Sequence, residues 1–455
     1  MLTIIVSLLF VLIKSEAAKI LGVFPTPSIS HQVVFRPVML ELVKRGHEVK
    51  VITTDPAFLK GQAPRNFTEI DIHNISYEHL KLHGNPENKT HPIDFDNFIN
   101  DFLINLFVKQ LNSTEIQTLL SSDEKFDLIF VESWVRPALV FSHIYDAPVI
   151  EFSSLGGINS ALEAIGAASH PLIYPNAMHR KIYNLTLWDK ITELYTHYSC
   201  QYYYMHHEQI ENEMLKSVLG SNIPDLKDLR QNVRMLFLNV HPIWDFNRPV
   251  PPNVLYLAGL HQKPREDLPK DLKIYLDSKR NGVIYVSFGH KNVKLFITQG
   301  GLQSTDEAIT AGVPLIGIPM LADQWYNAKQ YVKFNIGKRL LLETLTEDLL
   351  MDAIETIMGD KSYIQNIVKL RSFMIDQPQP PIESAVWWTE HVLRHTDVAY
   401  RRTPAANLHW TEYYELKIML FLLSVLITLL SLTVLVIHTI VTNIKYCLHL
   451  KVKEN

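Results

Sequence analysis

The chain has 455 residues, of which 47% are hydrophobic and 20% charged, so it can form two or three domains with large cores. Its formal net charge of -4 gives no sign of a nucleic-acid partner. With only two cysteines, Cys200 and Cys447, a disulfide framework is also excluded.

The N-terminus carries a segment typical of export. Residues 2–13 are an apolar run that is too short to span a bilayer, and Lys14 and a stretch of small residues up to Ala18 follow it. This pattern predicts a cleaved signal peptide over residues 1–18. No Lys or Arg precedes the run, so a buried first strand is the alternative interpretation.

The C-terminus carries a segment typical of a membrane anchor. Residues 418–444 contain no Asp, Glu, Lys or Arg, and this run exceeds the roughly 20 residues needed to cross the hydrocarbon core. The lysines of the tail, residues 445–455, place the tail in the cytosol by the positive-inside rule. We therefore predict a single-pass type I membrane protein with a juxtamembrane segment at 401–417 and a lumenal body.

Two further signs indicate the endoplasmic reticulum. Five N-glycosylation sequons lie on the predicted lumenal side, at Asn66, Asn74, Asn88, Asn112 and Asn184. Lys451 and Lys453 resemble the dilysine signal that returns type I proteins to the endoplasmic reticulum, and an ordinary basic juxtamembrane tail is the alternative.

The body has the pattern of two α/β lobes. Residues 19–245 are predicted to form the first, with a helix ending at Gly46 and strands at 19–25, 47–54, 126–132, 148–152 and 233–240. Residues 246–272 are rich in proline and charge, as in a linker. Residues 273–400 are predicted to form the second lobe, with strands at 283–288, 293–298 and 313–319 and helices at 304–311, 324–334, 346–358 and 361–374. Two such lobes favour a ligand cleft between them.

The strongest motif lies in the second lobe. A strand ends at Gly300 and Gly301, and a helix is predicted to begin at Ser304. Glycines let a ligand approach the backbone, and a helix N-terminus offers free N–H groups to a diphosphate. Ser304 and Glu307 also fit a capping box, in which both residues only satisfy the helix end. These residues alone leave both interpretations open.

The longer spacing resembles a known family. Over residues 296–324 the pattern is similar to the signature of UDP-dependent glycosyltransferases of the GT-B fold, and insect members match best. The Ser-His pair at His31, the segments 376–381 and 387–390 and the membrane tail extend the resemblance over almost the whole chain. The resemblance implies an α/β fold of the GT-B type, with two Rossmann-like lobes and a C-terminal transmembrane helix.

The resemblance also implies a donor site. Gln303 and Ser304 fall where the family contacts the diphosphate, and Glu307 falls where a carboxylate holds the ribose hydroxyls. Asp323 and Gln324 fall where the family binds the donor sugar.

One position of this donor site departs from the family. Gln299, directly before Gly300 and Gly301, stands where the family has a His that touches the phosphates. Because an amide is never cationic, we expect weaker phosphate stabilisation.

A general base is implied in the first lobe. His31 falls where an inverting transferase of this family takes the proton of the acceptor hydroxyl, and Glu132 falls where a carboxylate orients that base. Asp127 is the less favoured stand-in for Glu132. The alternatives are a helix-start residue for His31 and a solvated strand-end carboxylate for Glu132.

Part of the nucleotide-binding lobe is missing by comparison with the family. On the order of 55 residues, about two βα units, are absent between 283–289 and 290–298. The missing units carry the family's Trp that stacks on uracil, and this chain has no Trp between Trp244 and Trp325.

The gap conflicts with the Rossmann strand order, in which the strands at 283–288 and 293–298 would be parallel neighbours. Three residues, Gly289 to Lys291, reach roughly 10 Å, less than a strand of about 17–20 Å. We therefore predict that both strands cannot keep their family positions, and that one is displaced or the two merge or form a hairpin.

The resulting hypothesis is an inverting, metal-independent transfer of glucose or glucuronate from a UDP-sugar to small lipophilic hydroxyl compounds, as in detoxification. The UDP-sugar is a co-substrate and no other cofactor is expected. The alternative is a catalytically inactive truncated isoform, or a gene-model artefact, that binds acceptors or forms homo- or hetero-oligomers with related transferases. An unrelated nucleotide-sugar-binding module is a third reading. The tyrosines at 202–204 are expected in the core or in an acceptor-pocket wall.

Overall fold

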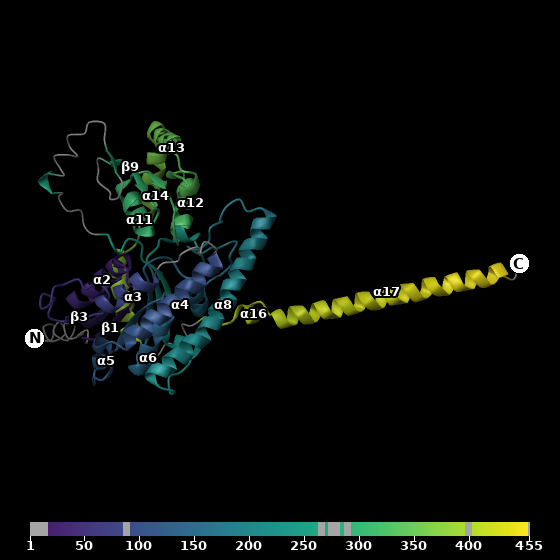
Figure 1. The fold of residues 1–455 in the computed structure, drawn as a ribbon, viewed down its shortest axis with the longest axis horizontal. Helices are drawn as coiled ribbons and strands as arrows, with labels where there is room; N and C mark the ends of the chain where they lie inside the picture. The colour runs from purple at the N-terminus through teal and green to yellow at the C-terminus, as the bar shows by residue number, and fades with distance from the viewer. Residues whose placement is uncertain are drawn as a thin grey trace, which may run out of the picture.

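The computed structural model describes residues 17–84, 92–262, 269–271, 283–285, 293–395 and 403–453. Two α/β lobes lie one above the other in Figure 1, and a long helix projects sideways from them. The description below therefore takes the two lobes first and the C-terminal helix last.

The first lobe is built on a seven-stranded sheet in the order β3-β2-β1-β4-β5-β6-β7, and every recorded pair of neighbours is parallel. This arrangement is the doubly-wound sheet that the βαβ pattern predicts. The strands are β1 (Lys19–Phe24), β2 (Glu48–Thr53), β3 (Phe67–Asp71), β4 (Leu128–Glu132), β5 (Val149–Ser153), β6 (Val233–Leu238) and β7 (Val254–Tyr256).

Helices cover both faces of this sheet because successive strand residues point to opposite sides. Leu21 and Val23 join the core under α4 and α5, whereas Ile20 and Phe24 join the core under α2. The helices are α2 (Ile29–Lys44), α3 (His73–His83), α4 (Pro92–Leu111), α5 (Thr114–Leu120), α6 (Val140–Ile144), α7 (Asn159–Ile165), α8 (Leu187–Leu219) and α9 (Leu226–Leu229).

The second lobe has a four-stranded sheet in the order β11-β10-β9-β8, again with parallel pairs. Its strands are β8 (Val283–Tyr285), β9 (Val293–Thr298), β10 (Leu315–Gly317) and β11 (Gly337–Arg339). Its helices are α11 (Leu302–Ala311), α12 (Gln324–Lys333), α13 (Glu347–Gly359) and α14 (Ser362–Ile375).

The prediction that the strands flanking the gap cannot be parallel neighbours is wrong. β8 pairs with β9 in parallel, with Val283 opposite Val293 and Tyr285 opposite Phe296. The described part of β8 is the three residues Val283–Tyr285, and seven residues lie between it and Val293 in the sequence. Seven residues reach up to roughly 23 Å, which is ample for returning along a three-residue strand.

The linker and the return helix both join the first lobe. Residues 254–256, inside the predicted linker, form β7 on the edge of the first sheet. After the second lobe, α15 (Pro381–Arg394) returns to pack on α2, where Ala385 and Val386 share a core with Val34 and Phe35.

The C-terminal helix α17 (Leu416–Lys453) follows a short helix, α16 (Trp410–Tyr413). Residues 416–445 of α17 are long and apolar enough to cross a membrane, and none of its most apolar window is buried in the protein. The predicted span at 418–444 lies inside this helix.

Two predictions about the lumenal body fall partly outside the described residues. Residues 1–16 of the predicted signal peptide lie outside them, as does Asn88. The other four sequon asparagines are exposed, which a glycan requires: Asn66, Asn74, Asn112 and Asn184. Their glycosylation stays a prediction.

Candidate functional site

A histidine–carboxylate pair lies at the carboxyl edge of the first sheet. His31 is in the first turn of α2, and Glu132 is the last residue of β4. His31 Nδ1 lies 2.5 Å from Glu132 Oε1. β1 and β4 are parallel neighbours, so the segments that follow their carboxyl ends meet at one edge of the sheet. This topology brings together two residues that are 101 positions apart.

Glu132 is held by hydrogen bonds to both of its carboxylate oxygens. Its side chain is 0% exposed, and its Oε2 accepts a hydrogen bond from the Thr26 N–H at 3.2 Å. Both carboxylate oxygens therefore have a donor, and the greater length of Glu compared with Asp does not prevent contact with His31. When Nδ1 donates to a carboxylate, the neutral imidazole keeps Nε2 free to accept a proton. The His31 side chain is 18% exposed, so a substrate can reach it.

The alternative partner, Asp127, lies at the opposite end of the sheet. Asp127 precedes β4, and its Oδ2 accepts a hydrogen bond from the N–H of Lys19, the first residue of β1, at 2.7 Å. Since His31 follows the other end of β1, Asp127 cannot orient it.

A buried glutamine fixes the loop that leads to His31. Gln32 Nε2 donates to the Phe24 carbonyl at 2.9 Å, and Gln32 Oε1 accepts from the Thr53 hydroxyl at 2.8 Å. The side chain thus ties the end of β1 to the end of β2. Sequence reasoning missed this residue, although a Gln on the buried face of a helix, next to the expected base, is a signal that could have found it.

The glycine loop of the second lobe opens α11. Gly300 has a φ of +94°, and a Cβ there would lie 3.2 Å from the Gln324 carbonyl oxygen, so glycine is required on both counts. α11 begins at Leu302, two residues before the predicted start, with Gly301 as its N-cap and no side-chain cap. The capping-box alternative for Ser304 and Glu307 is therefore wrong, because both residues lie inside the helix.

The first turn of α11 keeps donors for an anion. The Leu302 N–H donates to Asp323 Oδ2 at 3.1 Å. The next N–H groups, those of Gln303 and Ser304, belong to the first turn and have no intrahelical acceptor. These groups and the positive end of the helix dipole suit a phosphate.

Asp323 is both buried and hydrogen-bonded. Its Oδ2 also accepts from Asn327 Nδ2 at 2.8 Å, and Asn327 Oδ1 accepts from Trp244 Nε1 at 2.8 Å. Burial raises the pKa of Asp323 to about 6, although its hydrogen bonds and the nearby His31 imidazole lower it. Sequence reasoning missed Asn327 and Trp244.

Another direct contact between the lobes, besides that of Trp244 with Asn327, lies next to His31. The Gln303 amide donates to the carbonyl of Ser30, the residue before His31. A small cavity between the lobes is lined by Gly156, Gly157, Trp244, Leu302, Asp323 and Asn327, among others.

The remaining predicted donor residues make fewer contacts. Gln324 Oε1 accepts from the Met320 and Leu321 N–H groups at 2.9 Å each, so only its NH₂ group remains for a ligand. Glu307 is half-buried, and burial raises the pKa of its carboxyl. Gln299 is exposed at the end of β9.

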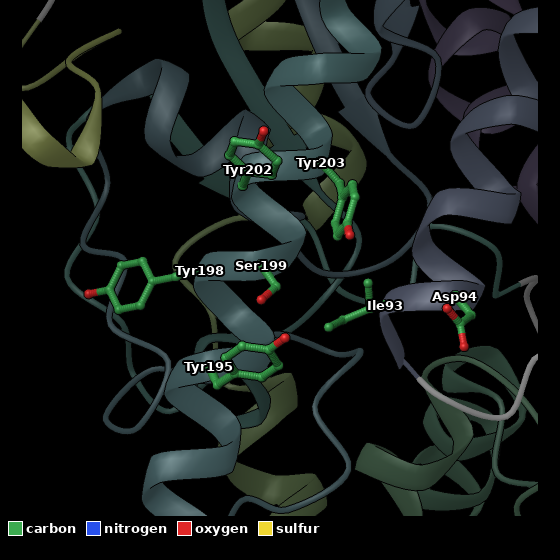
Figure 2. A pocket seen from close by; sticks show the side chains of 7 residues that line it. All are labelled: Ile93, Asp94, Tyr195, Tyr198, Ser199, Tyr202 and Tyr203. Carbon is green, nitrogen blue, oxygen red and sulfur yellow. The ribbon is translucent and has the colours of Figure 1, made fainter.

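The tyrosine cluster is split between two environments. Tyr202 and Tyr203 line an open hollow with Asp94, seen in Figure 2, and neither is buried in the core. Tyr204 instead packs its ring against the guanidinium of Arg136, 3.7 Å from the ring centroid. The prediction that these tyrosines lie in the core is therefore wrong for Tyr202 and Tyr203. Neither His31 nor Glu132 lines this hollow.

Two Rossmann-like lobes, with the start of α11 close to the segment that carries His31, form the architecture of the GT-B fold. The crystal structure of CalG4, the calicheamicin glycosyltransferase, has this fold and superposes with a TM-score of 0.53 at 14% identity, covering 84% of this chain and 100% of that one.

Comparisons of sequence identify the family. The profile described as "UDP-glucoronosyl and UDP-glucosyl transferase" matches residues 18–291 and 288–454, and the chain belongs to this family. The two matched segments meet where the missing piece was predicted.

Relatives match over most of their length. An ecdysteroid UDP-glucosyltransferase of Lymantria dispar multicapsid nuclear polyhedrosis virus is 35% identical, covering 90% of this chain and 94% of that protein. UDP-glucosyltransferase 2 of Dactylopius coccus is 27% identical, covering 90% of each.

Proposed function

We propose that this family member transfers glucose from UDP-glucose to a small lipophilic hydroxyl compound, with inversion at the anomeric carbon, and that the gap weakens donor binding. The observation that carries the proposal is the 2.5 Å contact between His31 Nδ1 and Glu132 Oε1, set opposite the start of α11. Glucose is favoured over glucuronate because the relatives are named UDP-glucosyltransferases.

The chemical step assigns one role to each lobe. His31 Nε2 takes the proton of the acceptor hydroxyl, whose oxygen attacks the anomeric carbon while the bond from that carbon to the diphosphate oxygen breaks. Glu132 orients the imidazole and stabilises the imidazolium that forms. UDP leaves with the bonding electron pair, and the N–H groups at the start of α11 stabilise its charge without a metal ion.

The donor would lie along α11. Ser304 and the Gln303 backbone would hold the diphosphate, Glu307 the ribose, and Asp323 and Gln324 the hexose. The Gln303 amide would have to leave Ser30 for its side chain to bind phosphate. Because stacking of a base on an aromatic ring contributes about 1–3 kcal/mol, loss of the uracil platform weakens donor affinity by roughly 5- to 150-fold.

The acceptor class follows from the same relatives. Four of the similar relatives are named ecdysteroid UDP-glucosyltransferases. Ecdysteroids are hydroxylated and lipophilic, so a steroid with several hydroxyl groups is the first acceptor to test.

An inactive isoform is the second candidate. It is favoured by the four-stranded second sheet, which lacks two βα units of the family, and by the Gln303–Ser30 contact that occupies a donor-binding side chain. Such a chain would bind acceptors or pair with full-length relatives.

One experiment separates the two. Microsomes carrying the full chain are titrated with UDP-glucose, UDP-glucuronate and UDP in the presence of an ecdysteroid. Saturable UDP binding with glucoside formation supports the transferase, whereas folded protein that binds neither UDP nor UDP-sugar supports the inactive isoform. A glucuronide product would instead overturn the choice of donor. Sequencing the transcript across codons 285–295 decides whether the gap is a gene-model artefact.

We also propose that the protein is held in the endoplasmic reticulum membrane as a type I protein with a lumenal body. The α17 helix and the four exposed sequon asparagines support this orientation. Endoglycosidase H should shift the protein to a lower mass in microsomes, and complete resistance with no other mass shift on deglycosylation would contradict a lumenal body.

A further inference from the structure

The helix α8 exposes an apolar and aromatic surface along one side. We define the α8 arc as Leu187, Trp188, Ile191, Tyr195 and Tyr202. Spacings of three, four and seven residues place these side chains within one sector of a helix that has 3.6 residues per turn. Leu187 and Trp188 are 76% and 73% exposed, and Tyr202 is 70% exposed.

The polar residues of the same part of α8 are partly turned inward. Glu193 and His197 are buried, and Asp189 is engaged with the Thr186 cap and with Lys181. The helix therefore presents its apolar side outward, the reverse of a surface helix in a soluble protein. Contiguous exposed apolar patches mark a contact with another molecule or a membrane.

The α8 arc lies beside the start of the membrane helix. Tyr198, which lies on α8 between Ile191 and Tyr202, packs on Trp410 of α16 with ring centroids 4.9 Å apart. α16 in turn contacts α17. In Figure 1 the N-terminal end of α8 extends toward the side of the body from which α17 projects. Leu408, Tyr413 and Tyr414 add exposed apolar area at the same junction.

Figure 2 shows how the arc relates to the open hollow. Tyr198 points to one side of α8 and Tyr203 to the other, with Tyr195 and Tyr202 along the helix between them. Tyr195 and Tyr202 belong both to the arc and to the wall of the hollow, whose volume is about 600 Å³.

We propose that the α8 arc lies in the interfacial region of the bilayer that α17 spans, so that the body contacts lipid at a second point. This proposal rests on the membrane assignment of α17 made above. Trp and Tyr are favoured at the bilayer interface because one end of each ring system is apolar and the other polar. Two consequences follow. The body is held in one orientation over the membrane, and the hollow opens at the lipid surface, where a lipophilic acceptor concentrates.

Lipid contact is tested by quenching in the full chain. Trp188→Cys is introduced into a Cys200→Ser, Cys447→Ser background, labelled with an environment-sensitive NBD fluorophore and reconstituted into phosphatidylcholine vesicles that carry nitroxide lipids. Leu59→Cys, 73% exposed on the first lobe and outside α8, is the matched control, and Val434→Cys in the middle of α17 is the membrane reference. Tyr195→Cys serves as a second arc position if the Trp188 variant does not fold.

We expect quenching at residue 188 to be at least threefold greater than at residue 59. Equal, low quenching at 188 and 59 with strong quenching at 434 overturns the lipid contact and leaves the α17 assignment intact. Low quenching at all three positions overturns both. A blue-shifted fluorophore at 188 without quenching means that a protein partner or a second copy covers the arc, which also overturns the proposal.

Discussion

Two buried carboxyl groups, Glu132 in the first lobe and Asp306 in the second, differ in their hydrogen bonds. In the first lobe Glu132 is fully buried, and each of its oxygens faces a donor, from His31 and from Thr26. In the second lobe Asp306 on α11 is also buried, but its Oδ2 has no hydrogen-bond partner among the described residues. Both oxygens of the first-lobe carboxylate are thus paired, whereas the second-lobe carboxyl keeps one oxygen without a partner in the described part of the chain.

The two sheets also differ in size. The first sheet keeps seven strands, so both loops that carry its pair are anchored on neighbouring strands. Among the described residues the second sheet has four strands, with β8 at one edge.

The largest expected effect is on His31, which is predicted to carry the proton transfer. His31→Ala should lower kcat about 1,000-fold with little change in the KM for UDP-glucose, because a general base contributes roughly 10²–10⁴. Turnover is measured in microsomes or, if the natural chain is below detection, in the grafted chain described below. His73→Ala, a half-exposed histidine of the same lobe, is the control. Unchanged turnover would remove His31 as the base.

Removing the charge of Glu132 should have the next largest effect. Glu132→Gln keeps the size of the side chain, but the amide can no longer stabilise the imidazolium, so we expect kcat to fall about 100-fold. The pH profile of kcat separates this role from a structural one, since a change in folding stability alone leaves the shape of that profile unaltered. A Glu132→Gln chain with a lower melting temperature and an unaltered profile would contradict the positioning role.

Restoring the missing segment of the second lobe should strengthen the binding of UDP. Inserting the corresponding segment of a full-length relative between residues 285 and 293 returns the missing βα units and the stacking Trp. We expect the Kd for UDP to fall about 30-fold, within the range that one stacked base provides. An insert with that Trp replaced by Ala is the control. Equal affinity of the natural and grafted chains would mean that the gap does not limit donor binding.

The smallest expected effect concerns the stability of the second lobe. Burial, with a smaller contribution from Glu307, raises the pKa of Asp306 to about 8. In the unfolded chain this carboxyl ionises near its ordinary pKa of about 3.9, so stability is lost as the pH rises from about 4 to about 8.

Asp306→Asn should remove this pH dependence and raise the free energy of unfolding at pH 8 by about 2 kcal/mol, an order-of-magnitude figure. Thermal melts of the full chain at pH 5 and pH 8 measure the difference, with the exposed Asp348→Asn as control. A gain that is the same at both pH values would show that Asp306 is not the titrating group.

Much of this molecule could be predicted from local sequence. The strands at 19–24 and 48–53 and the helices of the second lobe fall within about two residues of their predicted bounds, because hydrophobic periodicity is a local property. The run at 418–444 determined the long apolar helix by composition alone. The pairing of His31 with Glu132 followed only from a family resemblance, since nothing local links residues 101 positions apart.

Tertiary structure decided what depends on packing and length. The described residues of β8 pair with β9 in parallel, which strand lengths assumed from sequence had excluded. The start of α11 at Leu302, and with it the loss of the capping box, depends on Asp323 accepting from the Leu302 N–H, a contact between residues 21 positions apart. The exposure of the apolar side of α8 could not be predicted from the sequence either. Periodicity shows that a helix has an apolar side, but only the neighbouring elements decide whether that side is buried.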